Sequence, residues 1–362
     1  MLGGRNKISL RQALILMLAG IFSPAIRVLP SYTAEEAEQA AWLAPLPAMP
    51  ILFLLFLGLK TVFDAYPAAS LTDIIKTVLG KYLGNLVVIC YLLWIFLLVL
   101  LYTRYHADRL VTTIMPNTPL GWFSFMLLVV LAMAIRSGLT VIARMGEVII
   151  YIVIIIFVIL SALSLTNFTP ENITPISYLD ILPVMKGSMI SLALWGYLLY
   201  LFFMGDLIND KENLHNQGRE SAIFLGMVSI ILLFTTIGSL SHYLVAKMPI
   251  PYLSSIRIIS IYETIERLES LVVAVWSITD FIILATFITI ILHILKTLCG
   301  LQDTKSLVIP LCLLTYFGSM LLAGNLFQLE SFSNQFVVPG NILFQFILPT
   351  GIFLIGKARR VF

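Results

Sequence analysis

The sequence predicts an all-α polytopic membrane protein with ten transmembrane helices. Two observations support this fold class: the hydrophobic composition and the long segments without a charged residue. Of the 362 residues, 60% are hydrophobic and 11% are charged, against roughly a quarter charged in an ordinary soluble domain. Several charge-free segments exceed the roughly 17 to 25 residues that a helix needs to cross the hydrocarbon of a bilayer. They lack the alternation of a membrane barrel, so each must satisfy its backbone hydrogen bonds as a helix. These segments are Tyr82 to Thr103, Leu110 to Ile135, Val148 to Pro170, Ser221 to Ala246, Ser306 to Leu329 and Ser331 to Gly356.

The ten expected spans form one transmembrane domain over residues 1–362. They lie near 9–34, 41–60, 83–107, 119–135, 139–165, 187–206, 219–245, 269–298, 306–323 and 336–356. Cytoplasmic loops are rich in Lys and Arg, and placing the N-terminus inside puts most of the 22 basic residues there. Both termini are therefore expected in the cytoplasm. Arg27 falls inside the first span, and the outer set is Arg104, Arg109, Lys186, Lys247, Arg257 and Arg267.

The connections between the spans differ in character. On the inner side, "SLTDIIKTVLGKYLG" has apolar residues at helical spacing and a Gly stop, so we expect a helix along the membrane surface. The outer loop "TNFTPENITPISYLDILP" is rich in Pro and Asn, and "PIPYLSSIRIISIYETIERLES" before the eighth span has room for a short interfacial helix. The three cysteines have no metal or redox spacing and are interpreted as small buried hydrophobes.

Span one is interrupted by "GIFSPAIRVLP", residues 20–30, which contains Ser23, Pro24 and Arg27. Proline removes a backbone donor and clashes with the preceding turn, and in hydrocarbon the freed carbonyl needs a partner. One interpretation is a kink that packs against a neighbouring helix. The other is an unwound segment that exposes main-chain groups to a solute.

The second interpretation rests on symmetry between two halves of the chain. Many secondary transporters comprise two inverted repeats of five spans, in which the first helix of each repeat is discontinuous. Here repeat one would cover about 9–165 and repeat two about 187–356. Span six, the first of repeat two, has Gly196 in its middle, flanked by Trp195, Tyr197 and Tyr200. The pattern predicts a solute site between spans one and six.

Two ionisable residues lie deep in the predicted spans. Burying an unpaired guanidinium costs several kcal/mol, so Arg27 either extends to the outer surface, pairs with an acid such as Asp280, or binds a solute carboxylate. Asp280 lies in the middle of span eight, where an ionisable residue is a functional hypothesis by default. Thr279, Thr286, Thr289 and His293 share another face of that span, which is either a packing face or an ion pathway.

Other acidic residues near the inner ends, Glu147 and Asp206, are interpreted as solvated. The sequence has no catalytic constellation, metal-ligand spacing or phosphate-binding loop, so neither an enzyme nor a cofactor is expected. The net charge of +3 gives no indication of a nucleic-acid partner. The class of function that remains is binding or transport of a solute in the bilayer.

Several stretches resemble the spore germination B-subunit permeases. They are "ISLRQALILMLAG", "SLTDIIKTVLGKYLG", "YTRYHADRL" followed by "PNTPL", "VIARMGEVI" and "IERLESLVVAVWSITDF". The resemblance covers nearly the whole chain, and the Glu-Arg-Leu-Glu-Ser run before Trp276 is its most specific part. This match implies that four residues are family positions with a structural role: Arg104, Arg267, Glu269 and Trp276.

The resemblance implies membership of the amino acid, polyamine and organocation transporter superfamily, with its LeuT-like inverted fold. It further implies a germinant receptor subunit in the inner membrane of a bacterial spore. Such a subunit binds an amino-acid-like nutrient and acts with an A subunit and a lipoprotein C subunit. The alternative is an ion-coupled amino-acid permease, and a third option is a structural subunit of an assembly.

The chain also departs from the pattern of that family. The family usually has glycines where Ser23, Pro24 and Ala25 stand here, and it often has Glu where Leu198 stands. The departure implies either a solute different from the usual zwitterionic amino acid or a member that has lost binding.

Overall fold

The chain folds into one helical bundle. A computed structural model describes residues 7–259 and 269–362. The elements that follow the expected spans are α1 (Leu10–Ala37), α2 (Pro45–Ala65), α4 (Lys81–Thr113), α5 (Leu120–Ser137), α6 (Leu139–Ser164), α7 (Ile181–Trp195) with the 3-10 helix η5 (Gly196–Leu207), α8 (Leu214–Leu240), α11 (Glu269–Cys299), α12 (Val308–Leu321), and a last span of α13 (Leu326–Phe332), the π-helix η8 (Ser333–Val337), α14 (Val338–Ile342), the π-helix η9 (Leu343–Ile347) and α15 (Leu348–Ala358).

Shorter elements connect the spans. They are β1 (Ile8–Ser9), η1 (Glu38–Leu43), α3 (Leu71–Leu79), η2 (Leu165–Asn167), η3 (Pro170–Asn172), η4 (Tyr178–Asp180), β2 (Ile208–Asn209), η6 (Lys211–Asn213), α9 (His242–Lys247), α10 (Pro251–Arg257) and η7 (Lys305–Leu307). The expected helix at "SLTDIIKTVLGKYLG" is α3, which begins at a capping box of Ser70 and Asp73. The expected short helix before span eight is α10.

The all-α membrane fold is confirmed. Within residues 7–259 and 269–362, nine helices are long and apolar enough to cross a membrane. The ninth expected span is the shorter apolar helix Lys305–Leu321, so the number of ten crossings stays a prediction, as does the division into two repeats. Glycines with positive φ separate consecutive helices: Gly80 (φ 84°) stands between α3 and α4, and Gly138 (φ 100°) between α5 and α6.

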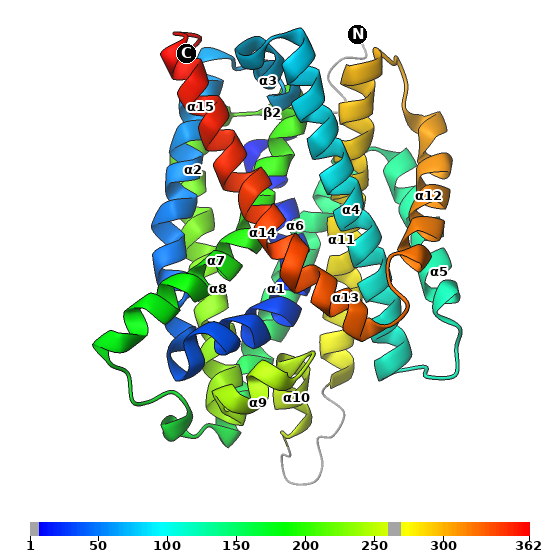
Figure 1. Cartoon of the computed structure of the whole chain (residues 1–362). Helices are drawn as coiled ribbons and strands as arrows, with labels where there is room; N and C mark the ends of the chain where they lie inside the picture. Colours follow the sequence, from blue (N-terminus) through cyan, green and yellow to red (C-terminus); the bar gives the residue numbers. More distant parts are fainter. Residues whose placement is uncertain (1–6, 260–268) are drawn as a thin grey trace.

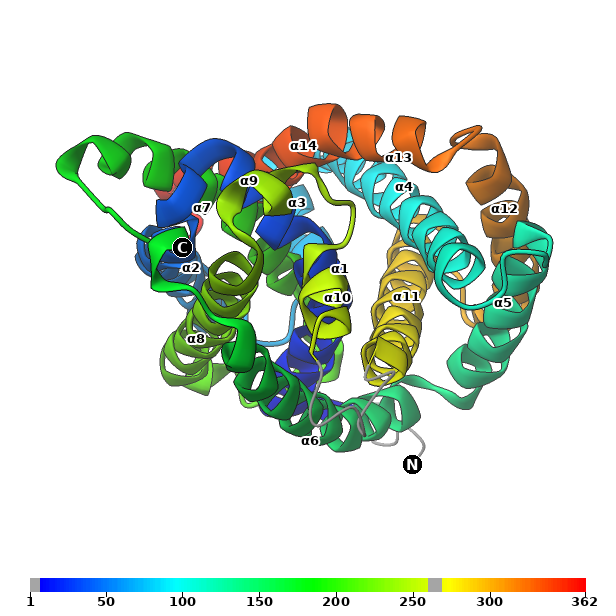
Figure 2. The same cartoon turned by 90° about the horizontal axis from the view of Figure 1, so that it is seen from below.

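Spans one and six lie at the centre of the bundle. In α1 nearly every residue from Leu10 to Ala34 is buried, and η5 is buried from Gly196 to Gly205. Viewed from below, α1 lies inside a surround of other helices, whereas α5 and α12 lie together at one edge (Figure 2). The strand β1 at the start of the chain pairs in parallel with β2 after span six, with Ile8 opposite Ile208 and Ser9 opposite Asn209.

Span one is not interrupted, which corrects the expectation of an unwound segment there. The α-helix runs from Leu10 to Ala37 with Pro24 and Pro30 inside it. A proline removes one backbone donor and kinks a helix without unwinding it, and neighbours on all sides hold this helix in place. The later part of α1 leaves the direction of the earlier part and crosses the lower half of the molecule (Figure 1).

Span six does change its winding at the predicted residue. The α-helix α7 ends at Trp195, and twelve residues from Gly196 onward form the 3-10 helix η5. A 3-10 run of this length is uncommon, and such a stretch inside a helix often marks a functional hinge. Near its end Met204 leaves helical geometry (φ −101°, ψ 26°).

Candidate functional site

A buried ionic cluster lies where α1, α4 and α11 meet. The Asp280 carboxylate on α11 forms an ion pair with the Arg109 guanidinium on α4. His106, one turn before Arg109, places Nδ1 2.9 Å from Asp280 Oδ2. From α1, the Ser23 hydroxyl donates to Asp280 Oδ1 at 2.5 Å and accepts from Arg109 Nη1 at 2.9 Å. Two predicted site residues, Ser23 and Asp280, are therefore in direct contact.

The cluster is closed to solvent. Asp280 and Ser23 are 0% exposed, and Arg109 and His106 are 5% and 6% exposed. Arg109 Nε also donates to the carbonyl of Tyr105, and its guanidinium carbon lies 5.2 Å from the ring of Trp276. A buried carboxylate is tolerated because its three polar partners, one of them the Arg109 cation, compensate it.

Sequence reasoning missed Arg109 and His106. Span three was expected to end near residue 107, which left Arg109 in the outer set of basic residues. The helix α4 instead continues to Thr113, so both side chains lie within the bundle. Their spacing of three residues, which places them on one helix face, was the available signal.

Arg27 does not pair with Asp280. Its side chain is buried, with 4% of the residue exposed, and its guanidinium carbon lies 3.4 Å from the ring centroid of Tyr105 on α4. This contact is a cation–π interaction. The Tyr105 hydroxyl donates elsewhere, to the carbonyl of Leu329 in α13 at 3.1 Å. In the described parts of the chain, Arg27 has no ion-pair partner.

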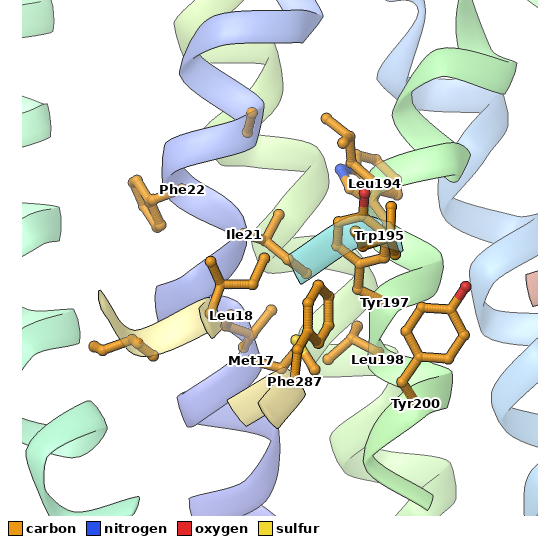
Figure 3. Packing of buried hydrophobic residues seen from close by; sticks show 14 of the residues in the cluster. Met17, Leu18, Ile21, Phe22, Leu194, Trp195, Tyr197, Leu198, Tyr200 and Phe287 are labelled. Atoms are coloured by element: carbon orange, nitrogen blue, oxygen red, sulfur yellow. The ribbon is translucent and has the colours of Figure 1, made fainter. Parts of the chain in front are cut away.

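The aromatic residues around Gly196 face α11 and α4. Tyr197 and Tyr200 stack with ring centroids 5.9 Å apart, and Phe287 of α11 packs edge-on against both. Trp195 is fully buried, and its Nε1 has no hydrogen-bond partner within the part of the chain that the structure describes. In Figure 3 the rings of Tyr197 and Phe287 lie next to Ile21 and Met17 of α1. Side chains, and not the free main-chain groups that were expected, meet between spans one and six.

Span ten completes this aromatic group with two polar residues that sequence reasoning missed. The Tyr197 hydroxyl lies 2.5 Å from that of Tyr102 and accepts from Asn341 Nδ2 at 2.9 Å. Gln345 Nε2 donates to the Tyr200 hydroxyl at 3.3 Å, and Gln345 is packed against Gly196. The π-helices η8 and η9 on either side of Asn341 are a geometry often found at functional sites.

The polar residues near the inner ends have partners of their own. His293 Nε2 lies 2.9 Å from Asp206 Oδ1, and Gln12 Nε2 donates to Glu147 at 3.1 Å. The hydroxyls of Thr279, Thr286 and Thr289 each donate to a carbonyl of their own helix. These threonines therefore belong to a packing face.

Two of the family positions, Arg104 and Trp276, are buried in the bundle. Arg104 forms an ion pair with Asp108 one turn later at 2.9 Å, and Trp276 packs in the bundle beside Arg109. Arg267 lies outside the described residues. Two cavities lie away from the ionic cluster: one of about 560 Å³ between α2, α3 and α15, and one of about 660 Å³ between α1 and α8 near Arg11 and Glu220.

Comparison with known proteins gives consistent results. A family model described as "Spore germination protein" matches residues 7–326. Two Bacillus subtilis (strain 168) proteins are similar: spore germination protein KB is 23% identical over 98% of this chain and 97% of its own length, and spore germination protein YndE is 25% identical over 78% of each. The crystal structure of MhsT in complex with L-phenylalanine has a TM-score of 0.65 at 13% identity, covering 97% of this chain and 99% of that chain. This likeness confirms the LeuT-like fold.

Proposed function

The chain belongs to the family of spore germination proteins, and from this premise we propose that it is a germinant receptor subunit that binds a small nutrient in the membrane. Its family and fold are those of a germination-related permease. The observation that supports a binding site is the buried ionic cluster of Ser23, Arg109 and Asp280, which shares α4 and α11 with the aromatic group around Gly196.

The proposed mechanism is a shift between two conformations. A solute that fits between α1, α4 and η5 must move the tyrosines that pack there, because Tyr102, Tyr197 and Tyr200 fill that region. Such a solute binds one arrangement of span six better than the other and so shifts the population. Partner subunits then read the new position of span six. By family resemblance, these partners are an A subunit and a lipoprotein C subunit in the inner membrane of the spore.

A second candidate, an ion-coupled amino-acid permease, is favoured by the transporter fold. The two functions differ in whether the solute is carried across the membrane. The full chain in proteoliposomes should bind a labelled solute saturably without accumulating it if it is a sensor, whereas uptake driven by an ion gradient would identify a permease. The solutes for this assay come from a germinant screen on spores whose only receptor contains this chain.

A double variant separates both functions from a purely structural role. Trp195→Ala with Tyr197→Ala removes the aromatic surface of span six, so a sensing chain should lose its dose-dependent germination. The control is Trp122→Ala with Tyr151→Ala on outward-facing positions that are 56% and 57% exposed. A normal germinant response of the Trp195/Tyr197 variant, assembled at wild-type level, would refute the sensing role.

A further inference from the structure

Four cations and two carboxylates are buried among the described residues, so two cations, Arg27 and Lys211, lack an ion-pair partner. Arg104 pairs with Asp108, and Arg109 pairs with Asp280. Lys211, at the inner end, donates to the carbonyl of Gly205 at 2.5 Å. Arg27 is the remaining buried charged side chain of the described residues, and no carboxylate lies within 4.0 Å of its nitrogens there.

The surroundings of Arg27 support its guanidinium without neutralising it. Tyr105 covers one face of the guanidinium plane, and Tyr32 and Tyr102 are its other close polar neighbours. The acidic residue on that side is Glu330, whose backbone carbonyl accepts from the Tyr32 hydroxyl at 3.3 Å. The Glu330 carboxylate stays beyond ion-pair distance of Arg27.

An arginine in this position cannot shed its charge. The guanidinium stays protonated in proteins, and an uncompensated charge inside a protein is unfavourable by several kcal/mol. A bound anion would remove this cost, and the planar fork of N–H groups suits a carboxylate. Arg27 therefore has the chemistry of an anion-binding residue.

The ionic cluster determines what else the solute can carry. A carboxylate is the strongest partner for the ammonium group of a zwitterionic ligand, but the fully buried Asp280 carboxylate is already neutralised by Arg109 and bonded to Ser23 and His106. The other buried acid, Asp108, is paired with Arg104. Among the buried side chains, the central site thus has more positive than negative charge.

We propose that this chain recognises a net-anionic solute, a small carboxylate without a cationic amine, and that Arg27 binds its carboxylate. This inference rests on the proposed function, since it names the class of solute that the receptor takes. Binding of the solute then reduces the free-energy cost of the buried Arg27 charge, and this reduction favours the bound conformation.

The test compares solutes that differ only in the amine. Purified full-length chain in lipid nanodiscs is titrated with lactate against L-alanine and with 3-phenyllactate against L-phenylalanine, at neutral pH. The hydroxy acid of at least one pair should bind saturably and at least tenfold more tightly than its amino acid. Tighter binding of the amino acids would overturn the anionic solute and leave the receptor function standing. Absence of saturable binding to all four, with no germinant found in the spore screen, would overturn both.

Variants assign the effect to Arg27. Arg27→Gln should weaken hydroxy-acid binding at least tenfold and abolish the rise in melting temperature that the ligand causes, whereas Arg27→Lys should weaken it less. Glu330→Gln should tighten binding, because it removes the competing negative charge. The matched control is Arg257→Gln on the exposed end of α10, which should bind as the wild type does. Unchanged affinity in Arg27→Gln would assign the anion to another residue and overturn the proposal.

Discussion

Replacing Asp280 with asparagine should destabilise the folded chain strongly. The substitution keeps the shape of the side chain and removes its charge, so Arg109 remains buried at 5% exposure without its ion-pair partner. Ser23 and His106 lose a charged acceptor at the same time. The whole change falls inside the bundle, where water cannot compensate.

The magnitude follows from the burial of the pair. Removing one partner of a buried ion pair costs about 3–5 kcal/mol, because the other charge is left uncompensated. Removing both charges should cost less, so Asp280→Asn combined with Arg109→Gln should be more stable than Asp280→Asn alone. An exposed pair gives the reference value: in Lys60 and Asp64 the side chains are 33% and 52% exposed, and Asp64→Asn should cost about 1 kcal/mol or less.

The assay is reversible unfolding of the purified chain in detergent, followed by tryptophan fluorescence. Trp276 lies 5.2 Å from the Arg109 guanidinium and is a local reporter of the cluster. The reasoning is refuted if Asp280→Asn is no less stable than Asp64→Asn, or if the double variant is less stable than the single one.

Three further predictions concern packing, hydrogen bonding and topology. Gly196→Ala would place a Cβ atom 2.0 Å from Gln345 Oε1 and should cost about 1–3 kcal/mol in the same unfolding assay; no loss would show that span ten yields there. Tyr197→Phe removes the hydroxyl that accepts from span ten at 2.9 Å and should cost about 1–3 kcal/mol, which wild-type stability would contradict. In a cysteine-free background, Glu171→Cys should react with an impermeant maleimide from outside and Gln302→Cys only after permeabilisation, and the reverse result would invert the topology.

The positions of the spans could be predicted because the bilayer imposes them directly on composition. A helix must be about as long as the hydrocarbon is thick, so charge-free runs locate it. The change of winding at Gly196 was predicted from the expected symmetry between the two halves of the chain, and the absence of a Cβ atom at this residue allows another side chain to approach closely. Gln345 is the side chain that makes this approach.

Pairings between distant spans could not be predicted in the same way. Asp280 was identified by its depth, but its partner depended on the length of α4 and on the rotation of that helix, neither of which periodicity determines. Pro24 was misleading because a proline inside an apolar span occurs both in kinked and in unwound helices. Only the packing around α1 decides between the two. Asn341 and Gln345 gave no signal because a lone amide in an apolar span is uninformative without its neighbours.

The parallel pairing of β1 with β2 restricts how the two central spans can move apart. It joins the beginning of span one to the end of span six through two residues in each strand. Separation of the two central helices at that end must break this short pairing. Movement at the end of span six is thus tied to the beginning of span one.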